Sequence, residues 1–222
     1  TKKTITLKNS KNIPNAISDG FNVAMSPRRG PVCINLPRNL LAEKNNYKIN
    51  EKIKSFKNTN NTQSNPSSIK RAAKLISNSS KGIIIVGGVI KHTSGFKPVI
   101  ELAEYLNVPI VTAAGHGDAI PFNHKLNAGQ MGPRGNPVAS RLVKNADIIL
   151  AIGTRLGFNS TFYSYENINK NAKIIQIELE KKMLGKYFPV KVKIHADAAT
   201  ATKQLYEEIK KEKIKLNVKD WT

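Results

Sequence analysis

Small, acidic and basic residues follow five apolar segments of the sequence, each at the point where the segment ends. These residues are Gly87, Gly88, Thr112, Gly153, Thr154, Arg155, Glu178 and Asp197, with His116 in the loop after the second segment. Glycine lets backbone amides approach a phosphate, arginine clamps a diphosphate with two parallel bonds, and a carboxylate accepts hydrogen bonds from a ribose or an adenine amine. These residue types predict a nucleotide-binding groove. Glycines after a strand are also found where the chain only needs a turn, so the alternative that this domain is a scaffold without a ligand remains open.

The segments that carry these residues alternate with helical patterns. Apolar runs predict five strands, at 81–88, 108–115, 147–154, 172–180 and 190–197, and apolar periodicity predicts helices between them. We expect Ser67 or Ser68 to cap the first of these helices. Strands that are apolar on both faces and alternate with helices indicate a parallel sheet covered on both sides. The sequence therefore predicts an α/β, doubly wound, Rossmann-like domain over residues 67–212, with its ligands at the carboxyl ends of the strands.

The first forty residues predict one helix, at 15–27, and one short strand, at 32–36, between turns at Gly30-Pro31 and Pro37. We expect this strand to have no partner within the chain, so that its sheet is supplied by a preceding domain. Residues 41–66 are polar and predict a linker, because such a stretch buries too little apolar area to offset its ordering entropy. Residues 213–222 predict a tail. Since the chain begins with Thr1, we expect it to be part of a longer protein.

Composition excludes several classes of function. The net charge is +21, but the lysines are scattered and aromatic residues make up only 6%, so we expect no nucleic-acid partner and at most an attraction for small anionic substrates. No apolar run approaches eighteen residues, which predicts no membrane span. A single cysteine, Cys33, fits a cytoplasmic setting. The four histidines lack metal-ligand spacing, so we expect no metal site.

The ordered set of strand ends resembles the central domain of thiamine diphosphate-dependent enzymes of the acetolactate synthase type. The resemblance runs through GIIIVGGVI, VPIVTAAGHGDAIP, NADIILAIGTRL, NAKIIQIELE and VKIHADA. The opening NAISDGFNVAMSPRRGPVCINLPRN resembles the last helix and strand of the family's pyrimidine-binding domain, with Asn39 in place of the usual acid. The resemblance implies that residues 1–40 end that domain, 41–66 cross to the central domain at 67–212, and 213–222 lead to a C-terminal domain that the chain lacks.

The resemblance also implies cofactors and partners. Thiamine diphosphate and Mg²⁺ are expected on the domains outside this chain, which then holds no catalytic residue and is inactive alone. In FAD-binding relatives an arginine-phenylalanine-aspartate pattern follows the third strand; here Arg155 is followed by Leu156 and Gly157. That difference argues against FAD in the central groove and leaves ADP open. The full-length enzyme is expected to be a dimer or tetramer.

Within the family, Lys182-Met183-Leu184-Gly185 resembles the sulfoacetaldehyde acetyltransferases. This implies a transferase that converts sulfoacetaldehyde and phosphate into acetyl phosphate and sulfite. An acetolactate synthase-type 2-oxo acid enzyme is the alternative. A nucleotide-binding or scaffold module without activity of its own also remains open.

Overall fold

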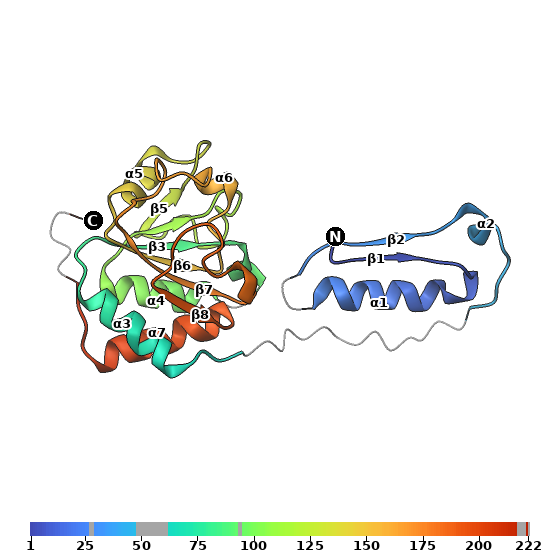
Figure 1. The fold of residues 1–222 in the computed structure, drawn as a ribbon, viewed down its shortest axis with the longest axis horizontal. Helices are drawn as coiled ribbons and strands as arrows, with labels where there is room; N and C mark the ends of the chain where they lie inside the picture. The colour runs from blue at the N-terminus through green and yellow to red at the C-terminus, as the bar shows by residue number, and fades with distance from the viewer. Residues whose placement is uncertain (27–28, 48–61, 93–94, 217–220, 222) are drawn as a thin grey trace. The chain divides into compact units, whose positions relative to one another are not determined.

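The computed structural model describes residues 1–26, 29–47, 62–92, 95–216 and 221. The chain divides into two compact units, an N-terminal unit at Thr1–Asn60 and a C-terminal unit at Asn61–Thr222 (Figure 1). Among the described residues, no helix has the length and apolar character needed to cross a membrane.

Six parallel strands form the sheet of the C-terminal unit, which confirms the predicted doubly wound α/β fold. Their order is β5-β4-β3-β6-β7-β8, so the chain builds outward from β3 in one direction and then from β6 in the other. The strands are β3 (Gly82–Val86), β4 (Ile110–Thr112), β5 (Asn127–Gln130), β6 (Ile148–Ile152), β7 (Lys173–Glu178) and β8 (Val192–His195). The order reverses between β3 and β6, where such sheets bind their ligands.

The sixth strand, β5, was missed, and the expected number of five was wrong. Its sequence is Asn-Ala-Gly-Gln, which lacks the β-branched residues that mark a strand. As an edge strand, β5 is only half-buried, and its register against β4 shifts between Ile110 and Thr112. β5 is therefore a strand because it pairs with β4, and its hydrophobicity and strand propensity would not predict one.

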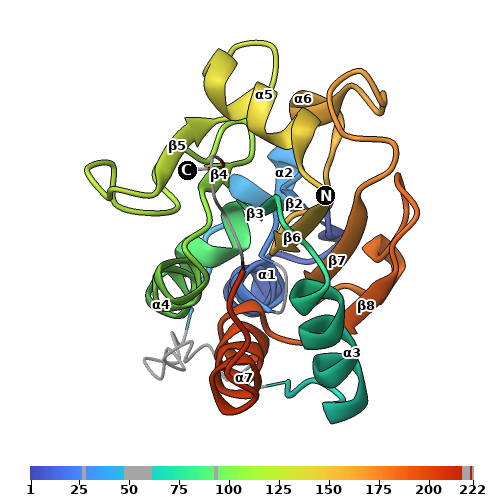
Figure 2. The ribbon, with the colours of Figure 1, turned by 90° about the vertical axis from the view of Figure 1, so that its left-hand side faces the viewer.

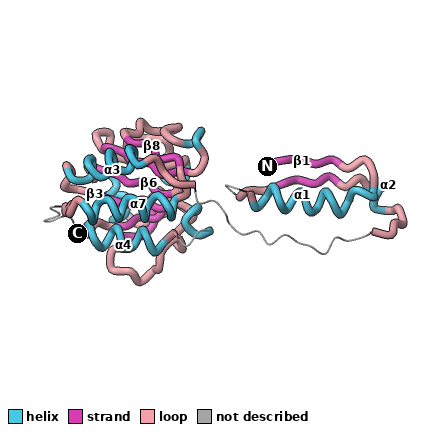
Figure 3. Tube along the Cα trace, turned by 90° about the horizontal axis from the view of Figure 1, so that it is seen from below, coloured by secondary structure: helices cyan, strands magenta, loops and turns pink. Residues whose placement is uncertain are grey.

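Helices cover the sheet on both faces. Helices α3 (Pro66–Ser77), α4 (Phe96–Leu106) and α7 (Ala198–Lys211) lie side by side on one face, and α5 (Pro137–Asn145) with the short α6 (Phe158–Thr161) lies on the other (Figures 2 and 3). Successive residues of a strand point to opposite faces of the sheet and so belong to two hydrophobic cores. Ile84 and Val86 pack with α3, α4 and α7, while Ile83 and Ile85 pack with α5. A short 3-10 turn at Gly88–His92 follows β3, and another at Lys181–Met183 follows β7.

Three helices of this unit begin with a side-chain cap. The side chains of Asn65, Asn136 and Asp197 accept hydrogen bonds from free backbone amides in the first turns of α3, α5 and α7. The predicted cap of α3, Ser67 or Ser68, was wrong, because Pro66 takes the first helical position and moves the cap to Asn65.

The N-terminal unit contains β1 (Lys3–Thr6), a 3-10 turn at Ser10–Asn12, α1 (Ile13–Met25), β2 (Val32–Asn35) and α2 (Arg38–Leu41). The prediction that the strand near residue 33 has no partner in the chain was wrong, since β1 pairs with β2 in parallel from Lys3↔Val32 to Thr6↔Asn35. The sequence of β1, Lys-Thr-Ile-Thr, has one apolar residue and therefore does not predict a strand. Among the described residues of this unit, the buried apolar ones are Leu7, Ala16 and Leu40, which form a small core.

The polar segment and the tail, which we expected at 41–66 and 213–222, are described only in part, because 48–61, 217–220 and 222 lie outside the described residues. The last described residues of the polar segment contact α7 and the residue that caps it. Thr62 O accepts a hydrogen bond from Asp197 N at 3.0 Å, and the Ser64 hydroxyl donates one to the side chain of Gln204. In the tail, Leu216 packs near Gly82 and Trp221 Nε1 donates to Gly82 O at 2.7 Å. These residues are therefore part of the folded C-terminal unit.

Candidate functional site

The strand register brings the predicted site residues to one edge of the sheet. Val86 of β3 pairs with Ile152 of β6, and Ile152 pairs with Ile177 of β7, so the three strands end level. The ladder continues past the strand ends: Gly87 N donates to Ile152 O, and Gly153 N donates to Ile177 O, both at 2.9 Å. Gly87 and Gly153 therefore lie next to each other at the point where the strand order reverses.

The two glycines face protein rather than an open groove. A methyl group at Gly87 would collide with Gly153 O and would lie 2.7 Å from Thr154 Cβ. Gly153 has φ +60°, in the left-handed region that favours glycine, and a methyl group there would lie 3.0 Å from Val89 Cβ. Both positions need glycine because the chain segments after β3 and β6 pass each other in contact.

Gly88 faces the ring of His116, so two residues predicted for the site do meet. A methyl group at Gly88 would lie 2.5 Å from Cε1 and 2.8 Å from Nδ1 of this imidazole. A second contact joins the same two loops, an ion pair between Lys91 and Asp118. The Lys91 ammonium, which hydrogen-bonds the carboxylate, holds the pKa of Asp118 below its usual range.

The loop that carries His116 is fixed at both ends. His116 N donates to Ala113 O, and Ala119 N donates to His116 O, each at 3.0 Å. Before the histidine, Ala114 N donates to Ser160 Oγ and Gly115 N donates to Gln130 Oε1, each at 2.9 Å. These bonds hold the loop to β5 and α6. Thr112, at the end of β4, is only 1% exposed, and its Oγ1 has no hydrogen-bond partner among the described residues.

Thr154 and Arg155 diverge after β6. Thr154 is buried, with its Oγ1 accepting from Leu156 N at 3.2 Å, whereas Arg155 is exposed. Arg155 lies near a stacked pair of rings, Tyr163 and Tyr187, whose centroids are 4.3 Å apart. The hydrogen bond between the two hydroxyls raises the pKa of Tyr163 and lowers that of Tyr187, and the positive charges of Lys186 and Arg155 further lower the pKa of Tyr187.

The two acidic residues of the predicted site serve the backbone. Glu178 is buried, and its Oε1 accepts from Leu179 N at 3.0 Å and from Glu180 N at 3.3 Å. Asp197 is the N-cap of α7, with Oδ1 accepting from the backbone amide and the hydroxyl of Thr200 at 2.9 and 3.0 Å. Both carboxylates therefore satisfy amide groups at strand and helix ends.

Sequence reasoning missed Gln176, the polar residue that ties these strand ends together. It lies within β7, is 2% exposed, and its Nε2 donates to Thr154 O at 3.0 Å. Its Oε1 accepts from Gly185 N at 2.7 Å, so one amide holds the loops that follow β6 and β7. The signal was a glutamine within the apolar run Ile-Ile-Gln-Ile, since a buried amide in a strand must find partners.

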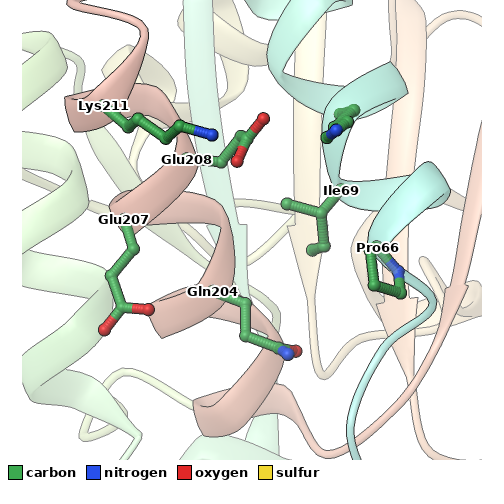
Figure 4. Close-up of a pocket in the computed structure, with 7 residues that line it drawn as sticks. Pro66, Ile69, Gln204, Glu207, Glu208 and Lys211 are labelled. Carbon is green, nitrogen blue, oxygen red and sulfur yellow. The ribbon is translucent and has the colours of Figure 1, made fainter.

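A surface groove between α3 and α7 lies away from these strand ends. Its volume is about 220 Å³. It is lined by Pro66, Ile69, Lys70, Gln204, Glu207, Glu208 and Lys211, and Figure 4 shows their side chains over the two helices. None of the residues predicted for the site contributes to it. Within the ranges that the structure describes, no three His, Cys, Asp or Glu side chains come together to hold a metal ion.

Comparisons with known proteins identify the fold by its relatives. The family model "Thiamine pyrophosphate enzyme, central domain" matches residues 69–205. The acetolactate synthase large subunit of Buchnera aphidicola subsp. Schizaphis graminum is 30% identical over 99% of this chain and 39% of its own length. A probable acetolactate synthase large subunit of Methanococcus aeolicus is 29% identical over 94% of the chain and 35% of its own length.

A relative of a different activity matches to a similar extent. The sulfoacetaldehyde acetyltransferase of Roseovarius nubinhibens is 32% identical over 81% of this chain and 29% of its own length. The chain thus spans less than half the length of each of these curated relatives.

Proposed function

Since this chain belongs to the thiamine pyrophosphate enzymes, we propose that it is the central, structural part of a thiamine diphosphate-dependent enzyme. The observation that carries this proposal is the match of the family's central domain to residues 69–205, which lie within the six-stranded unit. In this proposal residues 1–40 end a pyrimidine-binding domain, 41–66 link it to the central domain at 67–212, and 213–222 lead onward.

We place the cofactor and the chemistry outside this chain. Mg²⁺ takes oxygen ligands in octahedral geometry, and no acidic cluster among the described residues offers them. The polar groups at the strand ends are bonded mainly to the chain's own backbone, as Glu178 and Asp197 illustrate. The described residues therefore do not fit a site for thiamine diphosphate with Mg²⁺. We expect the chain of 222 residues to show no turnover by itself.

Two reactions are candidates for the whole protein. The 32% identity to a sulfoacetaldehyde acetyltransferase supports an acetyltransferase that forms acetyl phosphate and sulfite. The 30% identity to an acetolactate synthase over 99% of the chain supports a 2-oxo acid enzyme. The stretch Lys182–Gly185 does not separate them, because Met183 and Leu184 are buried and Gly185 is bonded to Gln176, so its pattern serves the fold.

The test is an activity assay on the full-length protein. With thiamine diphosphate and Mg²⁺, an acetyltransferase releases sulfite from sulfoacetaldehyde only when phosphate is present, whereas an acetolactate synthase consumes a 2-oxo acid without sulfite or phosphate. Leaving out thiamine diphosphate is the control for both assays. If the full-length protein turns over neither substrate, or turns one over without the cofactor, the proposed enzyme is wrong and a scaffold or nucleotide-binding module takes its place.

Further proposals concern the setting of the whole enzyme. We propose a dimer or tetramer, acting in the cytoplasm on small anionic substrates that the net charge of +21 attracts. Size-exclusion chromatography with light scattering measures the oligomeric state directly. The dependence of KM on ionic strength tests the attraction, since salt screens long-range steering.

A further inference from the structure

The groove at the carboxyl ends of β3 and β6 is where a sheet of this topology would hold a dinucleotide. We infer that the chain's own residues fill this groove, with the His116 imidazole seated on Gly88, and that the central domain therefore takes neither FAD nor ADP. The inference concerns the groove alone and holds for either reaction proposed above, and the unfolding and nucleotide-binding measurements below test it separately from the activity assay.

The glycines provide the first step. Glycine helps to bind a phosphate when its missing side chain leaves room for the ligand. Here the room beside Gly87 is taken by the backbone of Gly153 and Thr154, and the room beside Gly153 is taken by Val89. The space beside Gly88 is taken by His116, since a methyl carbon at Gly88 would lie 2.5 Å from Cε1 of the imidazole. Each of the three glycines at this edge is accounted for by protein packing.

The loop that carries His116 provides the second step, because a histidine on a mobile loop would yield to a ligand. Its neighbours Ala114 and Gly115 are bonded to Ser160 and Gln130, and the Lys91–Asp118 ion pair ties the far side of the loop to the turn after β3. The histidine is thus held in place from three elements, β5, α6 and the turn at Gly88–His92. A phosphate could reach Gly88 only after these contacts broke.

The acidic residues provide the third step. A carboxylate that binds a ribose or an adenine must have an oxygen directed at the ligand. The chain itself engages one oxygen of each carboxylate: Oε1 of Glu178 accepts from two backbone amides of its own loop, and Oδ1 of Asp197 accepts from both the amide and the hydroxyl of Thr200. Thr112 Oγ1 has no hydrogen-bond partner in the described part of the chain, but with 1% of the residue exposed it is closed to a ligand.

A double-mutant cycle on the 222-residue chain tests the contact between Gly88 and His116. Gly88→Ala forces a methyl group into the imidazole and should lower the midpoint of thermal unfolding by about 4 °C. His116→Ala removes the ring, so the double variant should unfold at the midpoint of His116→Ala alone. Gly117→Ala is the matched control, because its nearest neighbour is Gln130 Oε1 at 3.9 Å; it should be near neutral, with or without His116→Ala.

Additive effects of Gly88→Ala and His116→Ala would mean that the ring does not occupy the space beside Gly88, and the inference would be overturned. A direct measurement complements the cycle. FAD and ADP at millimolar concentration should leave the unfolding midpoint of the wild-type chain unchanged, whereas a ligand at a hundredfold excess over its Kd would raise it by at least about 5 °C. A saturable rise with either nucleotide would also overturn the inference.

Discussion

Replacing Gln176 by methionine should destabilise the C-terminal unit more than any change at an exposed position of the same strand. Methionine keeps the length and approximate volume of glutamine but has no amide. The substitution removes the bonds from Nε2 to Thr154 O at 3.0 Å and from Gly185 N to Oε1 at 2.7 Å. It also removes a longer bond from Nε2 to Met183 O at 3.4 Å, so three backbone groups in the loops after β6 and β7 would lose a hydrogen bond.

The magnitude follows from the burial of these groups. A buried polar group left without its partner costs about 1–3 kcal/mol, and Gly185 is only half-buried, so the loss should be about 3 kcal/mol in total. For a unit of about 160 residues, each kcal/mol moves the unfolding midpoint by about 2–4 °C, which gives a fall of about 6–12 °C. Thermal unfolding followed by circular dichroism measures this fall.

Amide hydrogen exchange gives a second, local measurement. The Gly185 amide should lose protection in Gln176→Met, because its acceptor is gone, while amides within α4 should change only as much as global stability does. Lys173→Met is the control, since Lys173 is exposed at the start of the same strand, and it should leave the midpoint within about 1 °C. A loss below about 1 kcal/mol, or unchanged protection at Gly185, would refute the idea that Gln176 holds the two loops.

Two further predictions concern charged residues at the same edge. Asp197→Ala should cost about 1 kcal/mol by removing the N-cap of α7, while Asp197→Asn should be nearly neutral, since asparagine caps as well as aspartate; equal losses in chemical denaturation would contradict the cap role. Lys91 holds the pKa of Asp118 below its usual value, so the stabilisation from this ion pair is present above the ordinary aspartate pKa and is lost as the pH falls through the lower, folded-state pKa. In an NMR titration, Lys91→Met should raise the pKa of Asp118 toward its ordinary value. An unchanged pKa would refute the pairing.

The sequence predicts the central strands of a sheet better than the strands at its edges. The runs at β3, β6 and β7 are apolar on both faces, a pattern that only a sheet covered on both sides explains. β5 and β1 have one apolar residue each, and they are strands because a neighbour pairs with them. Pairing is a tertiary effect that no local pattern reports, which is why β1 and β5 were both missed and β2 was expected to lack a partner.

The structure brings three residues of the predicted site to one edge of the sheet: Gly87 and Gly153 directly follow β3 and β6, and Glu178 is the last residue of β7. What each of them faces could not be read from residue type. Gly88 contacts a histidine 28 positions later in the chain, and Asp197 accepts from Thr200 within its own helix. Small residues and carboxylates suit a nucleotide, but they also suit strand ends that pack tightly and helices that need a cap.

This double use explains why a groove can keep the composition of a nucleotide site without leaving space for a ligand. The segments after β3 and β6 must pass each other where the sheet order reverses, and only glycine permits the contact of Gly87 with Gly153 O. Of the three glycines, only Gly88 would gain space if the loop after β4 stood further away, because its neighbour is the His116 ring. The space beside Gly88 is set by the loop after β4, where bonds to Gln130 and Ser160 hold His116 against the glycine. In the proposed filled groove, backbone contacts close the edge at Gly87 and Gly153, and the His116 ring, held by hydrogen bonds to a polar edge strand and a four-residue helix, closes it at Gly88.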